Sequence, residues 1–550
     1  MNLMGFRANA DQQLSFDDRM NRLTEREHRI LEKSWAEPFA TRIFPLIDEL
    51  KFSVLYCTDN GRPNTAVNVV IGSLLLKELT RLTDEELLES ILFDVRYQRA
   101  LHLTSCDEIP FSDRTVSRFR ERLYKYELET GEDLLKEEIE RLSGELSKVL
   151  KIQSNVMRMD SLMVSSSCKN MGRLELIYTC ISNLVKFMTK AGRSEILPAG
   201  LLKYSEDSNK NSVCYRMTKE EVSPRLESVT SDALLLHGVC ADIPEIVVTD
   251  EYKLLSRMLE DQTTNGQLKP KDEINSRSLQ NPSDEDATFR RKSGKGYQGF
   301  TANVVEACDD DVNIITHYDY EVNVHSDAEF GADIIEHLGK QEEETILISD
   351  GAYASEGNFR AAKANNIELV TTNLTGQVPP EMTGDFQIEG NELKACPAGH
   401  SPLDCKYNEQ KEEYRAHFDK ATCENCSHKE ECPVVMQVKR ALVRVSQKSI
   451  DRAQRTLNLS TEEYKAHARK RNGVEGVPSI LRRRYGVDYM PVRGLLRSKM
   501  WFGFKIGAIN VKRVIAAALN ATFLTLFVEN NVSNLLSDSF CKQNCFSQAI

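Results

Sequence analysis

An alternation of strand and helix patterns over residues 151–375 constrains the fold of this chain more than any other feature. Residues 156–159 predict a strand, residues 296–322 a β-hairpin, residues 328–341 an amphipathic helix, and residues 346–350 another strand. Residues 172–285, between the first strand and the hairpin, are mostly helical in pattern. This order predicts an α/β fold with a helical insertion after its first strand.

Both single strands close on an aspartate, Asp160 in the first and Asp350 in the second. Ligands of open α/β sheets bind at the carboxyl ends of strands, so both carboxylates are candidate ligands for a hard divalent ion. The alternative is that each aspartate only forms a turn, which is common for this residue at a strand end. Three further acids, Asp309 to Asp311, lie between the halves of the hairpin and are interpreted as its turn.

Charge is distributed unevenly along the chain. The 550 residues carry a net charge of −12, which taken alone argues against a nucleic-acid partner. Residues 465–513 nevertheless hold 13 Lys and Arg and only two acids, so this segment carries +11 and the remainder −23. The basic segment predicts a local surface that binds a polyanion. One of its acids, Glu475, lies among six basic residues and is either a salt-bridge partner or a metal ligand beside a phosphate track.

Residues 62–125 predict a compact helical unit. Thr83 and Glu86 have the spacing of a capping box, and another helix starts after Ser112 and Asp113. The exposed face of this second helix carries Arg114, Arg118, Arg122 and Lys125. Such a face either contacts DNA, as in helix-turn-helix proteins, or is simply solvated.

Four of the 14 cysteines form two groups in a charged segment that resembles an insertion. Cys396 belongs to "CPAGH", and Cys423, Cys426 and Cys432 belong to "CENCSHKEEC". Four thiolates in this arrangement are typical of a tetrahedral Zn²⁺ site, and a redox-active or unligated cluster is the alternative. A zinc ion would stabilise a small insert that has few apolar residues of its own.

Five segments, in order, carry a family likeness that covers most of residues 50–515. They are the helical region from "LYCTDNGRPN" to "SRFRERL", then "RMDSLMV", "SDEDATFRRKSGKGYQGFTANVV", "ISDGAYAS" and the block from "RNGVEGVPSILRRRYG" to "INVKRV". Together they resemble bacterial insertion-sequence transposases with an Asp-Asp-Glu site. The resemblance implies a ribonuclease H-like mixed sheet with helices, preceded by an α-helical N-terminal domain and carrying the helical and Cys-rich insertions.

The resemblance also implies the roles of particular residues. Asp160, Asp350 and Glu475 match the three carboxylates that bind two Mg²⁺ or Mn²⁺ ions for DNA cleavage and strand transfer. Arg471 and Arg482 match basic positions that flank the glutamate, and a comparable Cys-rich insertion supports the zinc site. The residues expected to contact DNA are Arg471, Arg482, Arg483, Arg484, Arg118 and Arg122. The expected partners are double-stranded DNA, both the element's terminal repeats and the target, and a second copy of the chain in a DNA-bound homodimer.

Two local departures accompany the likeness. Ala468 stands where the family has tyrosine, and "QGF" at residues 298–300 replaces the usual sequence of the hairpin. Gly473 and Gly476 bracket the start of the helix predicted to carry Glu475, and glycine lowers helix stability.

The expected organisation has six parts. Residues 1–50 form an N-terminal extension, 51–150 a helical domain of DNA-binding type, 151–375 and 451–530 the catalytic core, 172–285 the helical insertion, 376–450 the Cys-rich insertion and 531–550 a tail. The N-terminal residues have no apolar segment typical of a signal peptide, and residues 514–528 are too short to span a membrane. A cytoplasmic, nucleoid-associated protein is therefore expected. The alternatives are an inactive transposase descendant and a zinc-containing DNA-binding regulator without catalysis.

Overall fold

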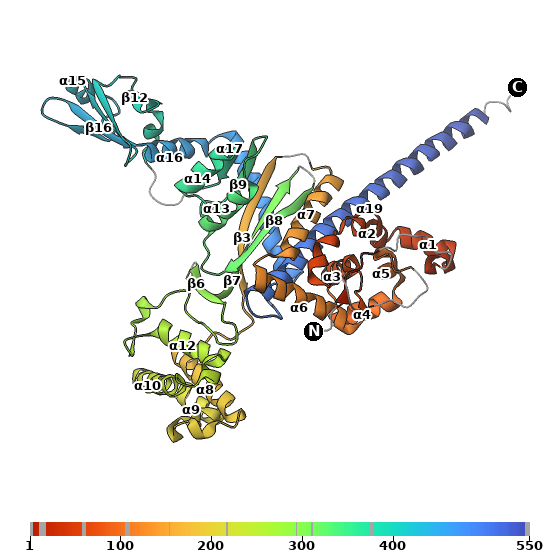
Figure 1. The fold of residues 1–550 in the computed structure, drawn as a ribbon. Coiled ribbons are helices and arrows are strands. Elements are labelled where there is room, and N and C mark those ends of the chain that lie inside the picture. The colour runs from red at the N-terminus through yellow and green to blue at the C-terminus, as the bar shows by residue number, and fades with distance from the viewer. Residues whose placement is uncertain are drawn as a thin grey trace.

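The computed structural model describes residues 4–9, 18–57, 62–104, 111–152, 155–215, 218–292, 294–309, 312–373 and 379–544 (Figure 1). The N-terminal helical region and the long C-terminal helix lie on one side of a central sheet, and two insertions project on the other side. No helix among the described residues is both long enough and apolar enough to cross a membrane.

The central sheet has the strand order β8-β7-β3-β9-β10. Its strands are β3 (Val156–Ser165), β7 (Lys295–Cys308), β8 (Asn313–Val322), β9 (Thr345–Ser349) and β10 (Ile367–Thr371). β3, β7 and β8 run antiparallel to one another, whereas β9 and β10 run parallel to β3. A sixth strand, β6 (Thr288–Lys292), pairs with the start of β7. Three antiparallel strands followed by two parallel ones form a mixed α/β sheet of the ribonuclease H-like kind, which confirms the predicted fold class.

The structure corrects one strand boundary. Asp160 was predicted to close its strand, but β3 continues to Ser165, so Asp160 lies in mid-strand. β3 pairs with β9 only from Val156 to Arg158. Its pairing with β7 extends to Ser165, and this pairing continues the strand beyond Asp160. The hairpin of β7 and β8 is confirmed, although Asp310 and Asp311 of its predicted turn lie outside the described residues.

Helices cover both faces of the sheet. On one face, α13 (Asp327–Leu338) and α14 (Glu356–Ala364) bury a cluster with Met159, Val305 and Leu347. On the other face, α7 (Leu134–Val149) and α19 (Leu495–Asn544) pack on β8. Three short helical segments complete the core at the carboxyl end of the parallel strands: α17 (Glu462–Asn472), the 3-10 helix η8 (Gly473–Glu475) and α18 (Gly476–Arg483).

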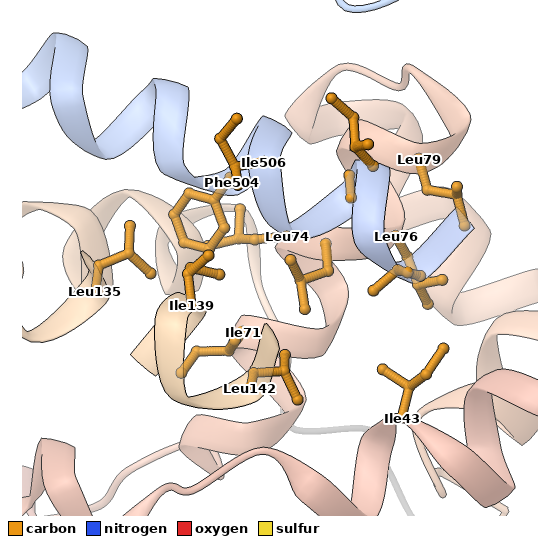
Figure 2. Packing of buried hydrophobic residues seen from close by; sticks show 14 of the residues in the cluster. Ile43, Ile71, Leu74, Leu76, Leu79, Leu135, Ile139, Leu142, Phe504 and Ile506 are labelled. Carbon is orange, nitrogen blue, oxygen red and sulfur yellow. The ribbon is translucent and has the colours of Figure 1, made fainter. Parts of the chain in front are cut away.

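The N-terminal helical region shares its core with the sheet. Its capping box at Thr83 and Glu86 is confirmed. In one cluster of buried residues, side chains of α3 and α7 surround Phe504 and Ile506 of α19, as Figure 2 shows. The described residues of the N-terminal helical region and the sheet are therefore joined by one continuous apolar interior. The elements of this region are β1 (Met4–Gly5), η1 (Arg19–Arg22), α1 (Glu25–Glu32), α2 (Ala36–Arg42), η2 (Phe44–Leu46), η3 (Leu50–Leu55), β2 (Arg62–Pro63), α3 (Val67–Thr80), α4 (Asp84–Phe93), α5 (Val95–Ala100) and α6 (Asp113–Thr130), followed by α7.

The segment between β3 and β6 is a helical unit with a core of its own. Tyr178, Leu184, Leu236 and Leu255 are among its buried residues, and none of them belongs to the clusters of the sheet. The elements are α8 (Arg173–Lys190), η4 (Ser194–Ile196), η5 (Ala199–Ser205), α9 (Asp207–Cys214), α10 (Val222–Cys240), α11 (Pro244–Val247), α12 (Asp250–Gln262), β4 (Thr263–Thr264), β5 (Gln267–Leu268) and η6 (Lys271–Glu273).

The Cys-rich segment is a small β unit at the end of α16 (Gln447–Asn458) (Figure 1). Its main sheet has the order β13-β14-β16-β15 and buries Phe418 and Val443. The elements are η7 (Glu381–Asp385), β11 (Gln387–Glu389), β12 (Glu392–Ala395), β13 (Asp404–Asn408), β14 (Glu413–Phe418), α15 (Lys420–Glu424), β15 (Val434–Met436) and β16 (Ala441–Ser446).

Candidate active site

The register of the parallel strands places Asp160 and Asp350 side by side. Arg158 of β3 is paired with Ile348 of β9, and each aspartate lies two residues beyond its member of this pair. Side chains two residues apart on a strand point to the same face. The pairing of β3 with β9 thus brings the two aspartates together, although they are 190 residues apart in the sequence. Only Asp350 lies at a strand end.

Glu475 reaches the same place from the basic segment. Helix α17 packs on β3 and β9, and η8, which ends at Glu475, also contacts β3. Arg471, one turn before Glu475, connects the three carboxylates. Its guanidinium lies 3.3 Å from Asp160, 3.9 Å from Asp350 and 2.8 Å from Glu475. All three predicted carboxylates therefore surround one positive charge.

Burial differs across this group and sets its electrostatics. The exposed fraction of the side chain is 16% for Asp160, 32% for Asp350 and 59% for Glu475. Burial raises the pKa of Asp160, Arg471 lowers it, and repulsion by Asp350 and Glu475 raises it again, so that the net direction is upward. The site concentrates more negative charge than one arginine neutralises.

A buried ion network holds the segment that carries Arg471. The guanidinium of Arg158 donates to Glu306 at 2.9 Å and to the carbonyl of Lys470 at 2.7 Å. Glu306 is fully buried on β7 and accepts a second arginine, Arg513 of α19. Gly473 leaves room for this network, since a Cβ atom there would lie 2.8 Å from Cζ of Arg158. Sequence reasoning missed Arg158 and Glu306 because nothing in their local patterns marks a contact across 148 residues.

Further buried contacts fix the two strands beneath the carboxylates. Tyr353, the tyrosine of "DGAYAS", donates to Asn303 of β7 at 2.8 Å, and Ser161 donates to Asp327 at 2.9 Å. Asp350 also accepts the backbone N–H of Ala352 at 2.8 Å. Asp350 therefore forms a turn, as the alternative interpretation expected, and also lies near the other two acids around Arg471.

The three carboxylates are suitable ligands for divalent ions, although their oxygen atoms are further apart than in an occupied metal site. Three carboxylates are the ligands that Mg²⁺ and Mn²⁺ prefer, and a single cationic group already lies within ion-pair distance of all of them. In the described part of the chain, the three carboxylates do not offer one oxygen each such that all three oxygens lie within 4.8 Å of one another. Arg471 occupies part of the space between them, so an ion bound by all three carboxylates would have to displace its guanidinium.

The predicted DNA-contacting arginines divide into exposed and engaged ones. Arg118 and Arg483 are exposed. Arg122 stacks on Tyr56 with its Cζ 4.6 Å from the ring centre, and Arg482 donates to the carbonyl of Met163 at 3.1 Å. Arg484 is partly buried. Arg482 is also exposed but is held by its contact with Met163, so Arg118 and Arg483 are the freer part of the basic surface.

The four cysteines of the predicted zinc site are neighbours in the β unit. Burial raises the pKa of Cys432 to about 11, and the thiols of Cys423, Cys396 and Cys426 contribute in the same direction. Cys405 lies apart, where its sulfur accepts the N–H of Leu393. In the described part of the chain, no three of these sulfurs lie within 4.8 Å of one another. The spacing of the sulfurs is wider than that of a closed zinc site, and the zinc site stays a prediction.

Two family models match the chain. A model described as Transposase DDE domain matches residues 395–515, and one described as Transposase domain (DUF772) matches residues 24–122. The first includes Arg471 and Glu475, and the second covers most of the N-terminal helical region. No curated protein and no solved structure matches the chain.

Proposed function

The two matches identify the chain as an insertion-sequence transposase of the DDE type, and on that premise we propose that it cuts and joins DNA with Asp160, Asp350 and Glu475. The observation that carries this proposal is the meeting of these three acids around Arg471. They come from three distant segments, β3, the end of β9 and η8. A DDE domain acts on DNA and depends on divalent metal, and the proposal assigns that dependence to these carboxylates.

Each residue has a defined task in this mechanism. The three carboxylates would hold Mg²⁺ or Mn²⁺, as a pair of ions, and the bound ions would supply Lewis-acid activation of the attacking and leaving oxygens. Water frees a 3′-hydroxyl at the element's end, and this hydroxyl then attacks target DNA in line. The rigid sheet positions Asp160 and Asp350, and positioning accounts for much of the rate of such reactions.

Arginines balance the charge of DNA in the proposal. Arg471 moves from the carboxylates to a phosphate when the ions bind, and the exposed Arg483 holds the flanking backbone. Arg118, on α6, extends the basic surface to the N-terminal helical region. Two copies of the chain on the two element ends complete the reaction, in the bacterial cytoplasm at the nucleoid. Cys396, Cys423, Cys426 and Cys432 would hold a structural Zn²⁺ once their sulfurs draw together, and such an ion would stabilise the β unit.

A second reading is a DNA-binding regulator without catalysis. It is favoured by the hydrogen bond that Asp350 accepts from the backbone N–H of Ala352, which is typical of a turn aspartate. In that case Arg471 would be a permanent partner of the three acids.

Replacement of one carboxylate separates these functions. Asp350→Asn keeps the size of the side chain, and should abolish Mg²⁺-dependent cleavage and joining of the inverted repeats that flank the coding region while leaving DNA binding intact. Asp242→Asn, an exposed aspartate of the helical insertion, is the control and should behave as the parent does. Wild-type rates in Asp350→Asn would refute the assignment, and DNA binding without cleavage by the parent protein would favour the regulator.

A further inference from the structure

A second candidate metal centre lies at the β8 edge of the sheet, whereas the acids around Arg471 lie at the inner strands β3 and β9. It consists of Glu140 on α7, His317 on β8 and His337 on the last turn of α13. Within the described residues, this is the one group of three or more His, Cys, Asp or Glu side chains whose ligand atoms all lie within 4.8 Å of one another. Three elements that are separate in the sequence therefore converge on a compact donor set.

The two histidines approach the two oxygens of Glu140. Nδ1 of His317 lies 3.9 Å from Oε1, and Nε2 of His337 lies 3.7 Å from Oε2. The imidazole rings meet edge to face with their centres 4.7 Å apart. Ligands at about 2.1 Å from a tetrahedral ion are separated by about 3.4 Å, and the two histidine–carboxylate distances exceed this by only a few tenths of an ångström.

An unpartnered nitrogen marks this cluster. Nδ1 of His317 is buried from solvent and has no hydrogen-bond partner, and at 3.9 Å Oε1 of Glu140 is too far away to accept a hydrogen bond from it. A buried polar atom without a partner is costly, by about 1–3 kcal/mol. A β-bulge opposite Val305 and Glu306 lies next to His317 in β8, and bulges re-aim side chains at such places.

The lysine beside this cluster is paired with another carboxylate. Lys136 is 3.9 Å from Glu140 but pairs closely with Asp319, at 2.5 Å. Oε1 of Glu140 also accepts the N–H of Tyr318 at 3.3 Å, a contact that orients the carboxylate. The side chain of Glu140 is only 12% exposed, whereas that of His337 is 49% exposed, so water can reach the cluster from one side.

We propose that Glu140, His317 and His337 bind a divalent transition ion of the Zn²⁺ type. Two imidazoles and one carboxylate suit Zn²⁺ and its neighbours in the first transition row, and they suit Mg²⁺ poorly. The open side leaves a fourth position for water. Because Glu140 belongs to the N-terminal helical region and both histidines belong to the core, the ion fastens these two regions to each other. This centre does not depend on the catalytic assignment of the three acids.

The test is a Zn²⁺ titration of the full-length protein by calorimetry in saturating Mg²⁺, which fills the acidic site. Parent protein should bind one equivalent more than His337→Gln, which alters a half-exposed side chain and leaves the core intact. His325→Gln is the matched control, because His325 pairs with a carboxylate, Asp333 at 2.8 Å, without a second imidazole. Since loss of an outer-shell partner already weakens metal binding roughly 10–100-fold, loss of a ligand should weaken it at least as much.

Co²⁺ separates this centre from the cysteines. Binding at the cysteines produces thiolate charge-transfer absorption in the near ultraviolet, whereas binding at Glu140, His317 and His337 produces only visible d–d bands. The visible Co²⁺ bands that come from Glu140, His317 and His337 should disappear in both His337→Gln and Glu140→Gln, while the thiolate absorption of the cysteines stays unchanged. Both signals should persist in His325→Gln. Equal Zn²⁺ stoichiometry and affinity in parent and His337→Gln, or unchanged visible Co²⁺ bands, would overturn the proposal.

Discussion

Replacing the two glycines beside Glu475 by alanine should have opposite effects. Gly473 and Gly476 both have right-handed backbone angles, with φ of −65° and ψ near −30°, that alanine adopts freely. A Cβ atom at Gly476 would meet nothing within 4 Å. Alanine there reduces the freedom of the unfolded chain, so Gly476→Ala should stabilise the local structure by about 0.5–1 kcal/mol.

Gly473→Ala has the same backbone benefit but collides with Arg158. The new Cβ would lie 2.8 Å from Cζ of Arg158 and closer still to Nη1. That guanidinium cannot simply swing away, since it is buried and held by Glu306 at 2.8 Å and by the carbonyl of Lys470 at 2.7 Å. Loss of the charged hydrogen bond to Lys470 costs about 1.5–3 kcal/mol. After the backbone benefit, Gly473→Ala should destabilise the segment by about 1–2 kcal/mol.

Hydrogen–deuterium exchange measures this difference where it arises. Peptides that cover residues 465–485 should exchange roughly 5–30-fold faster in Gly473→Ala and about 2–5-fold slower in Gly476→Ala, because 1.4 kcal/mol corresponds to about tenfold. Peptides from α8, in the separate core of the helical insertion, serve as an internal reference. Slower exchange in both variants would refute the packing of Arg158 against Gly473. DNA cleavage should fall in Gly473→Ala alone, because that variant displaces Arg471 and Glu475.

Three further predictions concern charge and metal. Asp160→Asn should raise the melting temperature at pH 7 without divalent ions. The pKa of Asp160 is raised in the fold. The stability contribution of this carboxyl group is therefore largest below the unfolded pKa of about 3.9 and declines as pH rises through the folded pKa. The gain should vanish below pH 4, and a gain that persists there would contradict this sign. Combined alanine substitution of the exposed Arg118 and Arg483 should lower the slope of log K against log salt for duplex DNA by about 2, and an unchanged slope would exclude them as phosphate contacts. Cys432→Ser should lower Zn²⁺ stoichiometry and speed exchange in β14 and β16 without altering α8, whereas unchanged stoichiometry would exclude the cysteine site.

The sequence by itself determined the elements of the core and their order. Apolar runs and helical periodicity are local properties, and so the hairpin of β7 and β8, helix α13, strand β9 and the capping box of Thr83 could be predicted from short segments. The candidate acids were also found locally, as charges in places where a strand or a basic segment makes them unusual. The family likeness added the prediction that Asp160, Asp350 and Glu475 belong to one site.

Only the tertiary structure decided how these pieces meet. The length of β3 depends on a partner strand far along the chain, which is why Asp160 was wrongly placed at a strand end. The glycine at 473 makes sense only beside Arg158, and the ion pairs of Arg471 with two acids outside its own segment depend on the packing of α17 on the sheet. Glu140, His317 and His337 carry no local pattern at all, because their donor atoms come together through packing of α7, β8 and α13. Contacts between distant segments depend on sheet register and core packing, and neither is encoded within any one short segment.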